Sequence, residues 1–379
     1  MKNVAVMGCT GSIGRTALAV VRNHPDRFRI TAIAARRESE EFASVAHEFR
    51  PSFAALSEGS ADFKKRLPNG TEYVFGKDAL LACAAADYDV LLAAVVGFAG
   101  LEGVLAAAER GKTIALANKE SLVAGGALVT GAAKRSGARI LPVDSEHSAL
   151  WQALSCRYDT PFEKLILTAS GGPFLRYSAD ALTRVTAKEA LRHPNWNMGA
   201  KITVDSATLF NKGLEVIEAT WLFGVPEERV EVVVHPQSVV HSMVEFADGA
   251  VIAQLGYPSM EVPVQLALSY PERISSSVPR LDFAELHKLE FERPDEERFP
   301  CLRLARQALR AGGSYPATAN AANEAAVNAL LSGKIGLCDI PSLIESALGA
   351  FDGKEATDFA QLAEIDEAAR RYVIRKIGD

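Results

Sequence analysis

The chain has 379 residues, which is enough for two or three domains with sizeable cores. Its formal net charge of -6 is mild for this length and argues against nucleic acid or an anionic membrane surface as the main partner. Its five cysteines are scattered singly without a CxxC pair, so we expect neither disulfides nor a thiolate zinc site. The sequence shows no transmembrane-like run and no signal or transit segment, so we expect a cytoplasmic protein.

A glycine-rich turn follows the first predicted strand. Lys2–Met7 is apolar and runs into Gly8-Cys9-Thr10-Gly11-Ser12-Ile13-Gly14 and then into an apolar helix. This GxxGxxG spacing between a strand and a helix is a variant of the dinucleotide-binding fingerprint, in which glycines let the backbone approach a pyrophosphate. The alternative is a glycine-rich turn in another kind of α/β unit.

Two arginines at the end of the second predicted strand indicate which dinucleotide binds. The strand over residues 29–34 ends in Ala35-Arg36-Arg37, where a protein that prefers NAD usually carries an acid. Arginines at this place favour the 2'-phosphate of NADPH. The alternative is that both are solvated loop charges.

Strands and helices alternate up to about residue 150. This alternation predicts a Rossmann-like, doubly wound parallel sheet whose ligands lie beyond the carboxyl ends of the strands. Two of these ends carry polar clusters, Asn118-Lys119-Glu120 and Asp144-Ser145-Glu146-His147. Asp144 and Glu146 would repel each other unless a cation lies between them, which predicts a hard divalent metal. The further strands are predicted over residues 53–56, 89–95, 113–116 and 139–143.

A loop and a helix in the middle of the chain gather polar residues of several kinds. The loop with His193, Trp196 and Met198 is bounded by proline and glycine, and this composition suits a movable cover over a site. KITVDSA, residues 201–207, is predicted as a short strand that ends near Ser206, the N-cap of the next helix.

That helix is predicted from about Ala207 to Phe223, and Asn211, Lys212 and Glu215 share one of its faces. The face can hold an anion and a cation side by side. The alternative is an exposed, salt-bridged helix after a surface loop.

Glu215 adds a third carboxylate to Asp144 and Glu146. Three carboxylates with no nearby cysteine favour Mg²⁺ or Mn²⁺ over zinc. Zinc stays open as a lesser alternative through His147, His193, His235 and His241, although the sequence has no HExxH helix. His235 and His241 flank predicted strands and are better explained as structural residues.

A Ser170-Gly171-Gly172 turn follows a predicted strand over residues 164–168 and offers a hydroxyl and free N–H groups for an anion. Further strands are predicted over residues 230–234, 242–246 and 251–255. We therefore expect an NADPH-binding domain over residues 1–150 and a central α+β catalytic and dimerisation domain over residues 151–270.

The C-terminal part is predicted to be a helical bundle. Residues 271–300 are charged and rich in turns, as in a linker, and the helical domain follows over residues 301–379. Within it, Asn320, Asn323 and Glu324 could reach a neighbouring part of the protein, but packing and capping explain them more simply.

Five longer motifs resemble the 1-deoxy-D-xylulose 5-phosphate reductoisomerase family, and the similarity runs through almost the whole chain. Cys9 stands where the family usually has serine, and Ala35-Arg36-Arg37 stands where many members have a Gly-Lys-Asn type of sequence. The motifs are the turn Gly8–Gly14, LANKESLV at Leu116–Val123, PVDSEHSA at Pro142–Ala149, ASGGPF at Ala169–Phe174, and the whole stretch His193–Glu218.

The resemblance implies a two-stage reaction in the methylerythritol phosphate pathway of isoprenoid precursor biosynthesis. A metal-assisted α-ketol rearrangement of 1-deoxy-D-xylulose 5-phosphate would be followed by NADPH reduction to 2-C-methyl-D-erythritol 4-phosphate. The resemblance and the prevalence of two-fold oligomers also imply a homodimer. Mg²⁺ and Mn²⁺ use the same oxygen ligands, so the sequence leaves the choice between them open.

The resemblance also implies the roles of individual residues. The metal ligands are Asp144, Glu146 and Glu215, and these act in catalysis with Lys119 and His193. The phosphate is held by Ser170, Ser206, Asn211 and Lys212. Other substrate contacts come from Lys119, Ser145, Met260 and the cover residues His193, Trp196 and Met198. Cofactor contacts come from Gly8, Thr10, Gly11, Ser12, Ile13, Ala35, Arg36, Arg37, Asn118, Glu120 and Gly199.

Two other functions fit part of the sequence. An NADPH-dependent dehydrogenase of another phosphorylated substrate would share the first domain, but plain hydride transfer does not need a carboxylate-bound metal. An NADPH-binding sensor has no need for Lys212, Glu215 and His193 together. The reductoisomerase is therefore our first hypothesis.

Overall fold

The computed structural model describes residues 1–155, 161–196 and 198–378, so Cys156 lies outside the described residues. The chain forms two compact units. Unit 1 comprises Met1–Ser121, Ala127–Ser145 and Met260–Val278, and unit 2 comprises Leu122–Gly126, Glu146–Ser259 and Pro279–Asp379. No helix in the described ranges is long and apolar enough to cross a membrane.

Unit 1 is built on a seven-stranded sheet in the order β4-β3-β2-β1-β5-β6-β7, and all its strand pairs are parallel. The strands β1 and β5 are almost wholly buried, as expected for a parallel sheet covered on both faces. The predicted doubly wound sheet is confirmed. Its strands are β1 (Lys2–Met7), β2 (Phe28–Arg37), β3 (Phe53–Glu58), β4 (Glu72–Phe75), β5 (Val90–Ala93), β6 (Thr113–Leu116) and β7 (Arg139–Pro142).

The strand order of unit 1 reverses between β1 and β5. With right-handed crossovers this reversal places α1 and α2 on one face of the sheet and α4 on the other. In sheets of this kind, ligands bind outside the carboxyl ends of the strands at such a reversal. Helix α1 packs against α11, and α3 packs against α4. The helices are α1 (Ser12–Asn23), α2 (Glu40–Phe49), α3 (Ala79–Ala85), α4 (Leu101–Glu109), α5 (Glu120–Ser136) and α11 (Glu261–Ser269), with short 3-10 helices at Ala61–Arg66 and Phe98–Gly100. Of α5, Leu122–Gly126 belongs to unit 2.

The edge strand β4 was not predicted. It has four residues, of which the two ends are exposed and the middle two are half-buried. So short a strand at the edge of a sheet carries too little apolar alternation to mark it in the sequence.

Unit 2 contains a four-stranded mixed sheet in the order β11-β10-β8-β9. Strand β10 runs antiparallel to β8 and β11, whereas β8 and β9 are parallel. The strands are β8 (Phe162–Ala169), β9 (Val230–Val234), β10 (Val240–Phe246) and β11 (Val251–Leu255). The helices before the C-terminal bundle are α6 (Ser145–Ser155), α7 (Ala179–Leu182), α8 (Ala187–Ala190), α9 (Ala200–Ala207), α10 (Phe210–Phe223) and α12 (Phe283–Leu286), with a 3-10 helix at Glu227–Arg229.

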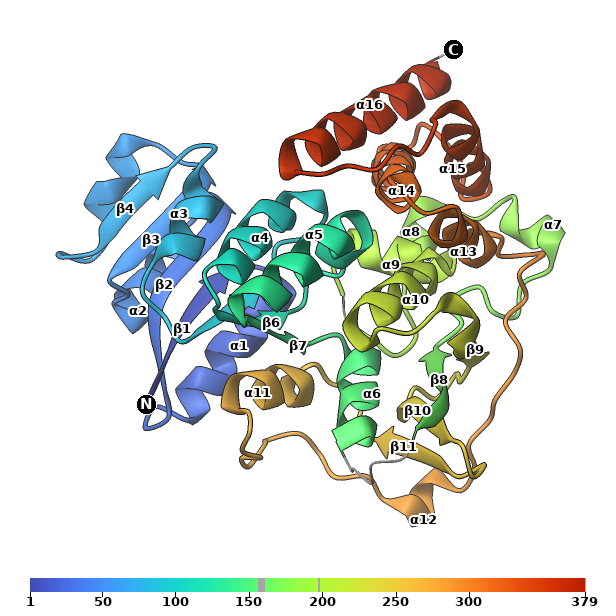
Figure 1. Cartoon of the computed structure of the whole chain (residues 1–379), viewed down its shortest axis with the longest axis horizontal. Helices are drawn as coiled ribbons and strands as arrows, with labels where there is room; N and C mark the ends of the chain where they lie inside the picture. The colour runs from blue at the N-terminus through green and yellow to red at the C-terminus, as the bar shows by residue number, and fades with distance from the viewer. Residues whose placement is uncertain (156–160, 197, 379) are drawn as a thin grey trace. The chain divides into compact units, whose positions relative to one another are not determined.

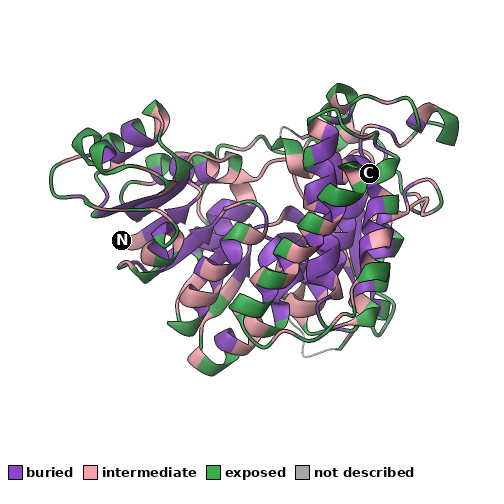
Figure 2. Cartoon of the chain, turned by 90° about the horizontal axis from the view of Figure 1, so that it is seen from above, coloured by how far each residue is buried: buried purple, intermediate pink, exposed green. Residues whose placement is uncertain are grey.

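The predicted C-terminal bundle is present in unit 2, where Figure 1 shows α13 to α16 in orange and red. Helix α10 contacts α13 on one side and strands β8 and β9 on another, and α14 packs against α15 and α16. Helix α14 is buried at most of its positions, and Figure 2 shows the buried residues of the chain in purple and the exposed ones in green. The bundle consists of α13 (Cys301–Ala311), α14 (Tyr315–Leu331), α15 (Asp339–Ala350) and α16 (Phe359–Gly378).

The prediction of a strand over KITVDSA is wrong, because these residues belong to helix α9. The β-branched residues Ile202, Thr203 and Val204 favour a strand locally. The buried positions Thr203, Val204 and Ala207 nevertheless follow the spacing of a helix, and α9 packs against α10 and α14. Tertiary packing has overridden local propensity.

The predicted start of the next helix is also wrong. Ser206 lies inside α9 and its hydroxyl donates to the carbonyl of Ile202 at 2.8 Å, so it is not an N-cap. Helix α10 begins at Phe210, after Leu209, whose φ of 60° lies in the left-handed region.

Candidate functional site

The glycine turn of unit 1 brings backbone segments so close together that there is no room for a side chain at Gly8 or Gly14. Gly8 has a φ of +91°, and a Cβ there would lie 2.5 Å from the carbonyl oxygen of Ala94. A Cβ on Gly14 would lie 2.2 Å from the carbonyl oxygen of Gly8. Helix α1 starts after Gly11, which has no side chain to cap it, so its first N–H groups suit an anion.

Arg36 and Arg37, at the carboxyl end of β2, both pair with the carboxylate of Glu58. Their Nε atoms lie 2.6 and 2.8 Å from the two carboxylate oxygens of Glu58. The two guanidinium groups, Arg37 first, hold the pKa of Glu58 below its usual value. Sequence reasoning missed Glu58, which comes to lie opposite Arg37 only through the pairing of β2 with β3.

Asn118 organises the loop after β6. Its Nδ2 donates to the carbonyls of Val95 and Gly97 at 2.6 and 3.0 Å and to Glu120 at 3.0 Å. Its Oδ1 accepts from the backbone N–H of Ser121 at 3.1 Å. The side chain therefore fixes the loop that follows β5 against the start of α5.

Lys119 and Asp144 form an ion pair within unit 1, with 2.5 Å between Nζ and Oδ2. Their side chains are 6% and 12% exposed. Both lie directly after neighbouring strands of the parallel sheet, β6 and β7, as the sequence predicted. Ser145 follows Asp144, is buried, and begins α6.

Two carboxylates of unit 2 converge on one buried lysine. The Nζ of Lys212 lies 2.7 Å from Glu146 and also donates to Glu215, and the carboxylate oxygens of Glu146 and Glu215 lie within 4.8 Å of each other. Burial lowers the pKa of Lys212, but the carboxylates of Glu146 and Glu215 outweigh burial, and the net shift is upward. Asn211 donates to Glu215 from the same helix face, as predicted.

A buried histidine supports this cluster. The Nε2 of His147 lies 2.9 Å from the backbone carbonyl of Glu215 and must donate to it, because a carbonyl only accepts. Its Nδ1 lies 3.5 Å from the carboxylate of Glu218, and both side chains are fully buried. His147 therefore fixes the backbone of α10 at Glu215.

His193 is held in one tautomer. Its Nδ1 accepts from the backbone N–H groups of Asn195 and Trp196 at 3.2 and 3.0 Å, so the proton of the neutral ring is on Nε2. That nitrogen lies 2.9 Å from the hydroxyl of Ser170 and donates to it. Burial lowers the pKa of His193 to about 4, against an upward effect of the Glu146 carboxylate.

The serine–glycine turn meets the end of α9. Gly171 and Gly172 have φ values of +82° and +70°, and a Cβ on Gly172 would lie 2.6 Å from the carbonyl oxygen of Ser206. The turn after β8 and the helix that carries Ser206 are therefore in close contact. The hydroxyl of Ser170 also accepts from the N–H of Gly172 at 3.2 Å.

The loop after α8 is attached to the sheet of unit 2. Asn195 donates to the carbonyl of Pro236 at 2.6 Å and to the hydroxyl of Ser238 at 3.0 Å. The ring of Trp196 lies 6.2 Å from the ring of His241, between centroids. His235 has a structural role, as predicted, because its nitrogens pair with the carbonyl of Glu290 and the N–H of Val239.

The chain is similar to curated relatives over nearly its whole length. It is 46% identical to 1-deoxy-D-xylulose 5-phosphate reductoisomerase of Laribacter hongkongensis, with 99% of each chain covered. It is 49% identical to the enzyme of the same name from Methylobacillus flagellatus, with 99% of this chain and 97% of that one covered. The chain belongs to the 1-deoxy-D-xylulose 5-phosphate reductoisomerase family.

Family models and solved structures agree with this assignment. The 1-deoxy-D-xylulose 5-phosphate reductoisomerase model matches residues 4–126, and its two C-terminal domain models match residues 140–223 and 255–372. The structure of the Zymomonas mobilis enzyme in complex with NADPH has a TM-score of 0.92 and 41% identity, and 99% of each chain is covered. A DOX-P reductoisomerase with NADPH, fosmidomycin and magnesium has a TM-score of 0.93 and 42% identity, with 100% of this chain and 98% of that one covered. The resemblance read from the sequence is confirmed.

The residues that the reductoisomerase resemblance singled out fall into both units. Unit 2 brings together Glu146, Ser170, His193, Ser206, Asn211, Lys212 and Glu215, with Trp196, Met198 and Gly199 in the loop before α9. Unit 1 holds Gly8, Thr10, Gly11, Ser12, Ile13, Ala35, Arg36, Arg37, Asn118, Lys119, Glu120, Asp144 and Ser145, and also Met260, which precedes α11.

The lowered pKa of His193 predicts how its protonation and its effect on stability depend on pH. With a folded-state pKa of about 4 against 6.5 ordinarily, the unfolded chain binds a proton between these pH values that the folded chain does not. The neutral ring of His193 therefore adds its full contribution to the free energy of unfolding above about pH 6.5, and this contribution is lost as the pH falls toward 4. We expect histidine-selective NMR to show His193 neutral and protonated on Nε2 at pH 5.5, with the signal assigned by its absence in His193→Gln. A midpoint near 6.5 would contradict the buried, hydrogen-bonded ring.

Proposed function

We propose that the chain converts 1-deoxy-D-xylulose 5-phosphate to 2-C-methyl-D-erythritol 4-phosphate by an α-ketol rearrangement and reduction by NADPH. Membership of the reductoisomerase family supports the reaction. The single structural observation that carries it is the cluster in which Glu146 and the buried Glu215 both pair with the buried Lys212. A plain dehydrogenase has no need for such a concentration of carboxylates.

The divalent metal would be held by Asp144, Glu146 and Glu215. Glu146, Glu215 and Lys212 together carry a formal net charge of one negative unit, with Lys212 and Glu215 buried, and a further cation would stabilise it. Asp144 is two residues before Glu146, so the backbone keeps their Cα atoms within about 7 Å of each other. Oxygen ligands suit Mg²⁺, which three solved structures of similar enzymes contain. When bound, the metal would act as a Lewis acid on the oxygens of the substrate's ketone and a neighbouring hydroxyl.

Donors from the middle of unit 2 suit the substrate's phosphate. We assign Ser170 as a hydroxyl donor, Asn211 as an amide donor and Lys212 as the charge that pairs with the phosphate. We assign Ser206 as a second hydroxyl donor, whose O–H would turn from the carbonyl of Ile202 to the phosphate. The contact between the Gly172 turn and Ser206 supports this grouping. Lys119 and Ser145 would orient the substrate's hydroxyls near the carboxylates, and Met260 would pack beside it.

His193, Trp196 and Met198 would close over the substrate and exclude water, so that the aldehyde formed by the rearrangement is reduced rather than lost. The neutral, Nε2-protonated ring of His193 makes it a hydrogen-bond donor in this role. Its low pKa argues against proton transfer by this ring as a cation near neutral pH.

The glycine turn would hold the pyrophosphate of NADPH, through Gly8, Thr10, Gly11, Ser12 and Ile13 and the N-terminus of α1. Ala35, Arg36 and Arg37 would contact the adenosine side. Asn118, Glu120 and Gly199 would lie by the nicotinamide half. NADPH would supply the hydride.

The first test is NADPH oxidation at 340 nm with 1-deoxy-D-xylulose 5-phosphate, with Mg²⁺ and after chelation. We expect metal-dependent oxidation that yields the branched product. Glu215→Gln should lower kcat by at least about 100-fold, because it removes a metal ligand, and should leave the NADPH dissociation constant unchanged. Glu228→Gln, an exposed carboxylate, is the matched control. NADPH binding without turnover of this substrate under any divalent metal would refute the proposed reaction.

Arg36 and Arg37 should determine the preference for NADPH. Replacing both by alanine removes the charges proposed for the 2'-phosphate and should weaken NADPH binding by roughly 10- to 100-fold, the scale of hydrogen bonds to charged groups. NADH binding should stay nearly unchanged. Arg29→Ala, an exposed arginine at the other end of β2, controls for loss of surface charge. An unaltered ratio of NADPH to NADH affinity would remove the assignment.

We further propose a cytosolic homodimer. Strand β11 is an edge of the unit 2 sheet and is half-exposed along most of its length, which suits pairing with a second copy. The buried thiols of Cys9, Cys83 and Cys301 are free, as in a reducing compartment.

Light scattering should give twice the chain mass, and Val251→Lys on β11 should lower the measured mass toward that of the monomer. A monomer at micromolar concentration would contradict the dimer.

A further inference from the structure

Helix α9 connects the parts of the proposed phosphate site. It follows the loop that contains His193 and Trp196, carries Ser206 in its last turn, and is followed by α10, which carries Lys212. Any rotation of α9 would therefore move Ser206 relative to the donors on α10.

The junction between α9 and α10 is tight. Leu209 is buried and has a φ of 60°, a strained conformation for a residue with a Cβ that persists only where the surroundings enforce it. The hydroxyl of Thr208 accepts from the N–H of Phe210 at 3.3 Å, which helps to start α10. The position of α10 relative to Ser206 thus depends on how firmly α9 is held.

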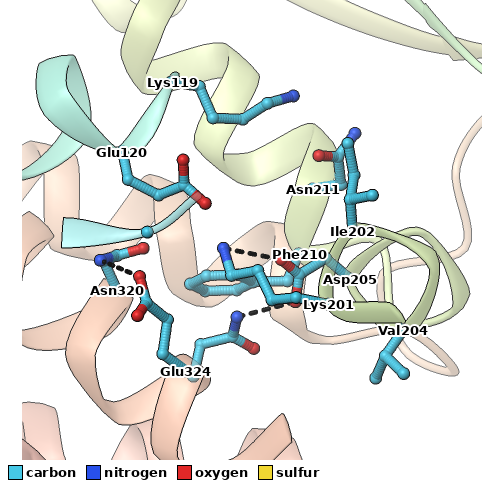
Figure 3. A network of polar contacts seen from close by, with 12 residues as sticks. Lys119, Glu120, Lys201, Ile202, Val204, Asp205, Phe210, Asn211, Asn320 and Glu324 are labelled. Carbon is cyan, nitrogen blue, oxygen red and sulfur yellow. Dashed lines mark hydrogen bonds and ion pairs between the residues drawn. The ribbon is translucent and has the colours of Figure 1, made fainter. Parts of the chain in front are cut away.

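One buried carboxylate attaches α9 to the C-terminal bundle. Asp205 is only 1% exposed and lies directly before Ser206. Lys201, one turn earlier, pairs with it at 3.0 Å, and the amide of Asn323 on α14 donates to it at 2.8 Å. Figure 3 shows Asp205 at the end of both contacts. Because a buried carboxylate is unfavourable without such partners, the contacts restrict where it can lie.

The polar face of α14 continues to α16. Asn320 donates to Glu324 at 3.0 Å (Figure 3), and Arg370 binds the other oxygen of Glu324 at 2.7 Å. The same arginine binds both oxygens of Asp366, one turn away on α16. Three helices are therefore linked by polar side chains.

Capping does not explain these asparagines, contrary to the expectation from the sequence. Asn320 and Asn323 lie in the interior of α14 and are fully buried. Within the described part of the chain, the Oδ1 of Asn323 accepts no hydrogen bond. The bond from its Nδ2 to Asp205 therefore explains why an amide is buried at this position.

We propose that Asp205 is a positioning residue for substrate binding, held by Asn323 so that Ser206 stays aligned with the phosphate donors on α10. The inference rests on the proposed role of Ser206. It makes the C-terminal bundle part of the substrate site through a residue pair that touches neither substrate nor cofactor.

The test measures KM for 1-deoxy-D-xylulose 5-phosphate, kcat, the NADPH dissociation constant and the melting temperature in full-length variants. Asn323→Ala and Asp205→Asn should each raise KM about tenfold, the scale of one hydrogen bond to a charged group, while NADPH affinity stays the same. The double variant D205N/N323D exchanges donor and acceptor and should recover most of the loss. Asn328→Ala, an exposed asparagine on the same helix, should behave as the unmodified protein.

A lowered melting temperature with unchanged KM in the single variants would overturn the inference, because the pair would then only stabilise the fold. A double variant as impaired as the two single changes combined would also overturn it. If Asn323→Ala does not fold, Asp205→Asn, which keeps the shape, decides alone. Ser206→Ala separates the two proposals: if it leaves KM unchanged, the phosphate assignment itself fails, whereas a raised KM there with unchanged KM in both pair variants rejects only the role of Asp205.

Discussion

Two carboxylates around one buried ammonium are the constraint on which the centre of unit 2 depends. Glu146 and Glu215 both contact Lys212, and charges out of water are stable only when their partners are held in place. Two features hold them. His147 fixes the carbonyl of Glu215, and α10 itself is buried from Phe210 through Ala219 at nearly every position.

The burial of α10 requires packing on more than one side. It contacts the sheet through β8 and β9 and the bundle through α13. A Cβ on Gly213 would lie 2.4 Å from that of Ala305, so a residue without a side chain allows α10 and α13 to approach. The C-terminal helices, to which we assign no contact with substrate or cofactor, are thus needed to keep a charged helix inside the protein.

Most of the architecture could be predicted because it depends on local patterns. The strand before Gly8, the glycine turn and the polar ends of β6 and β7 follow from periodicity and turn chemistry that lie within a few residues. Lys212 and Glu215 were placed on one face because helix geometry alone relates them. Glu58 and His147 were not given their roles, since the arginines that Glu58 meets are 21 and 22 residues away and the carbonyl that His147 binds is 68 residues away.

The wrong prediction for KITVDSA shows that the choice between strand and helix periodicity determines which side chains share a face. As a strand, the segment would place Lys201, Thr203 and Asp205 on one polar face, free to meet water, with Ile202 and Val204 on the other. As a helix, it brings Lys201 one turn from Asp205 and turns the carboxylate inward. The amide of Asn323, 118 residues along the chain, is a further partner of the buried carboxylate. Local sequence patterns therefore favour a strand, whereas the long-range contact with Asn323 stabilises the helix.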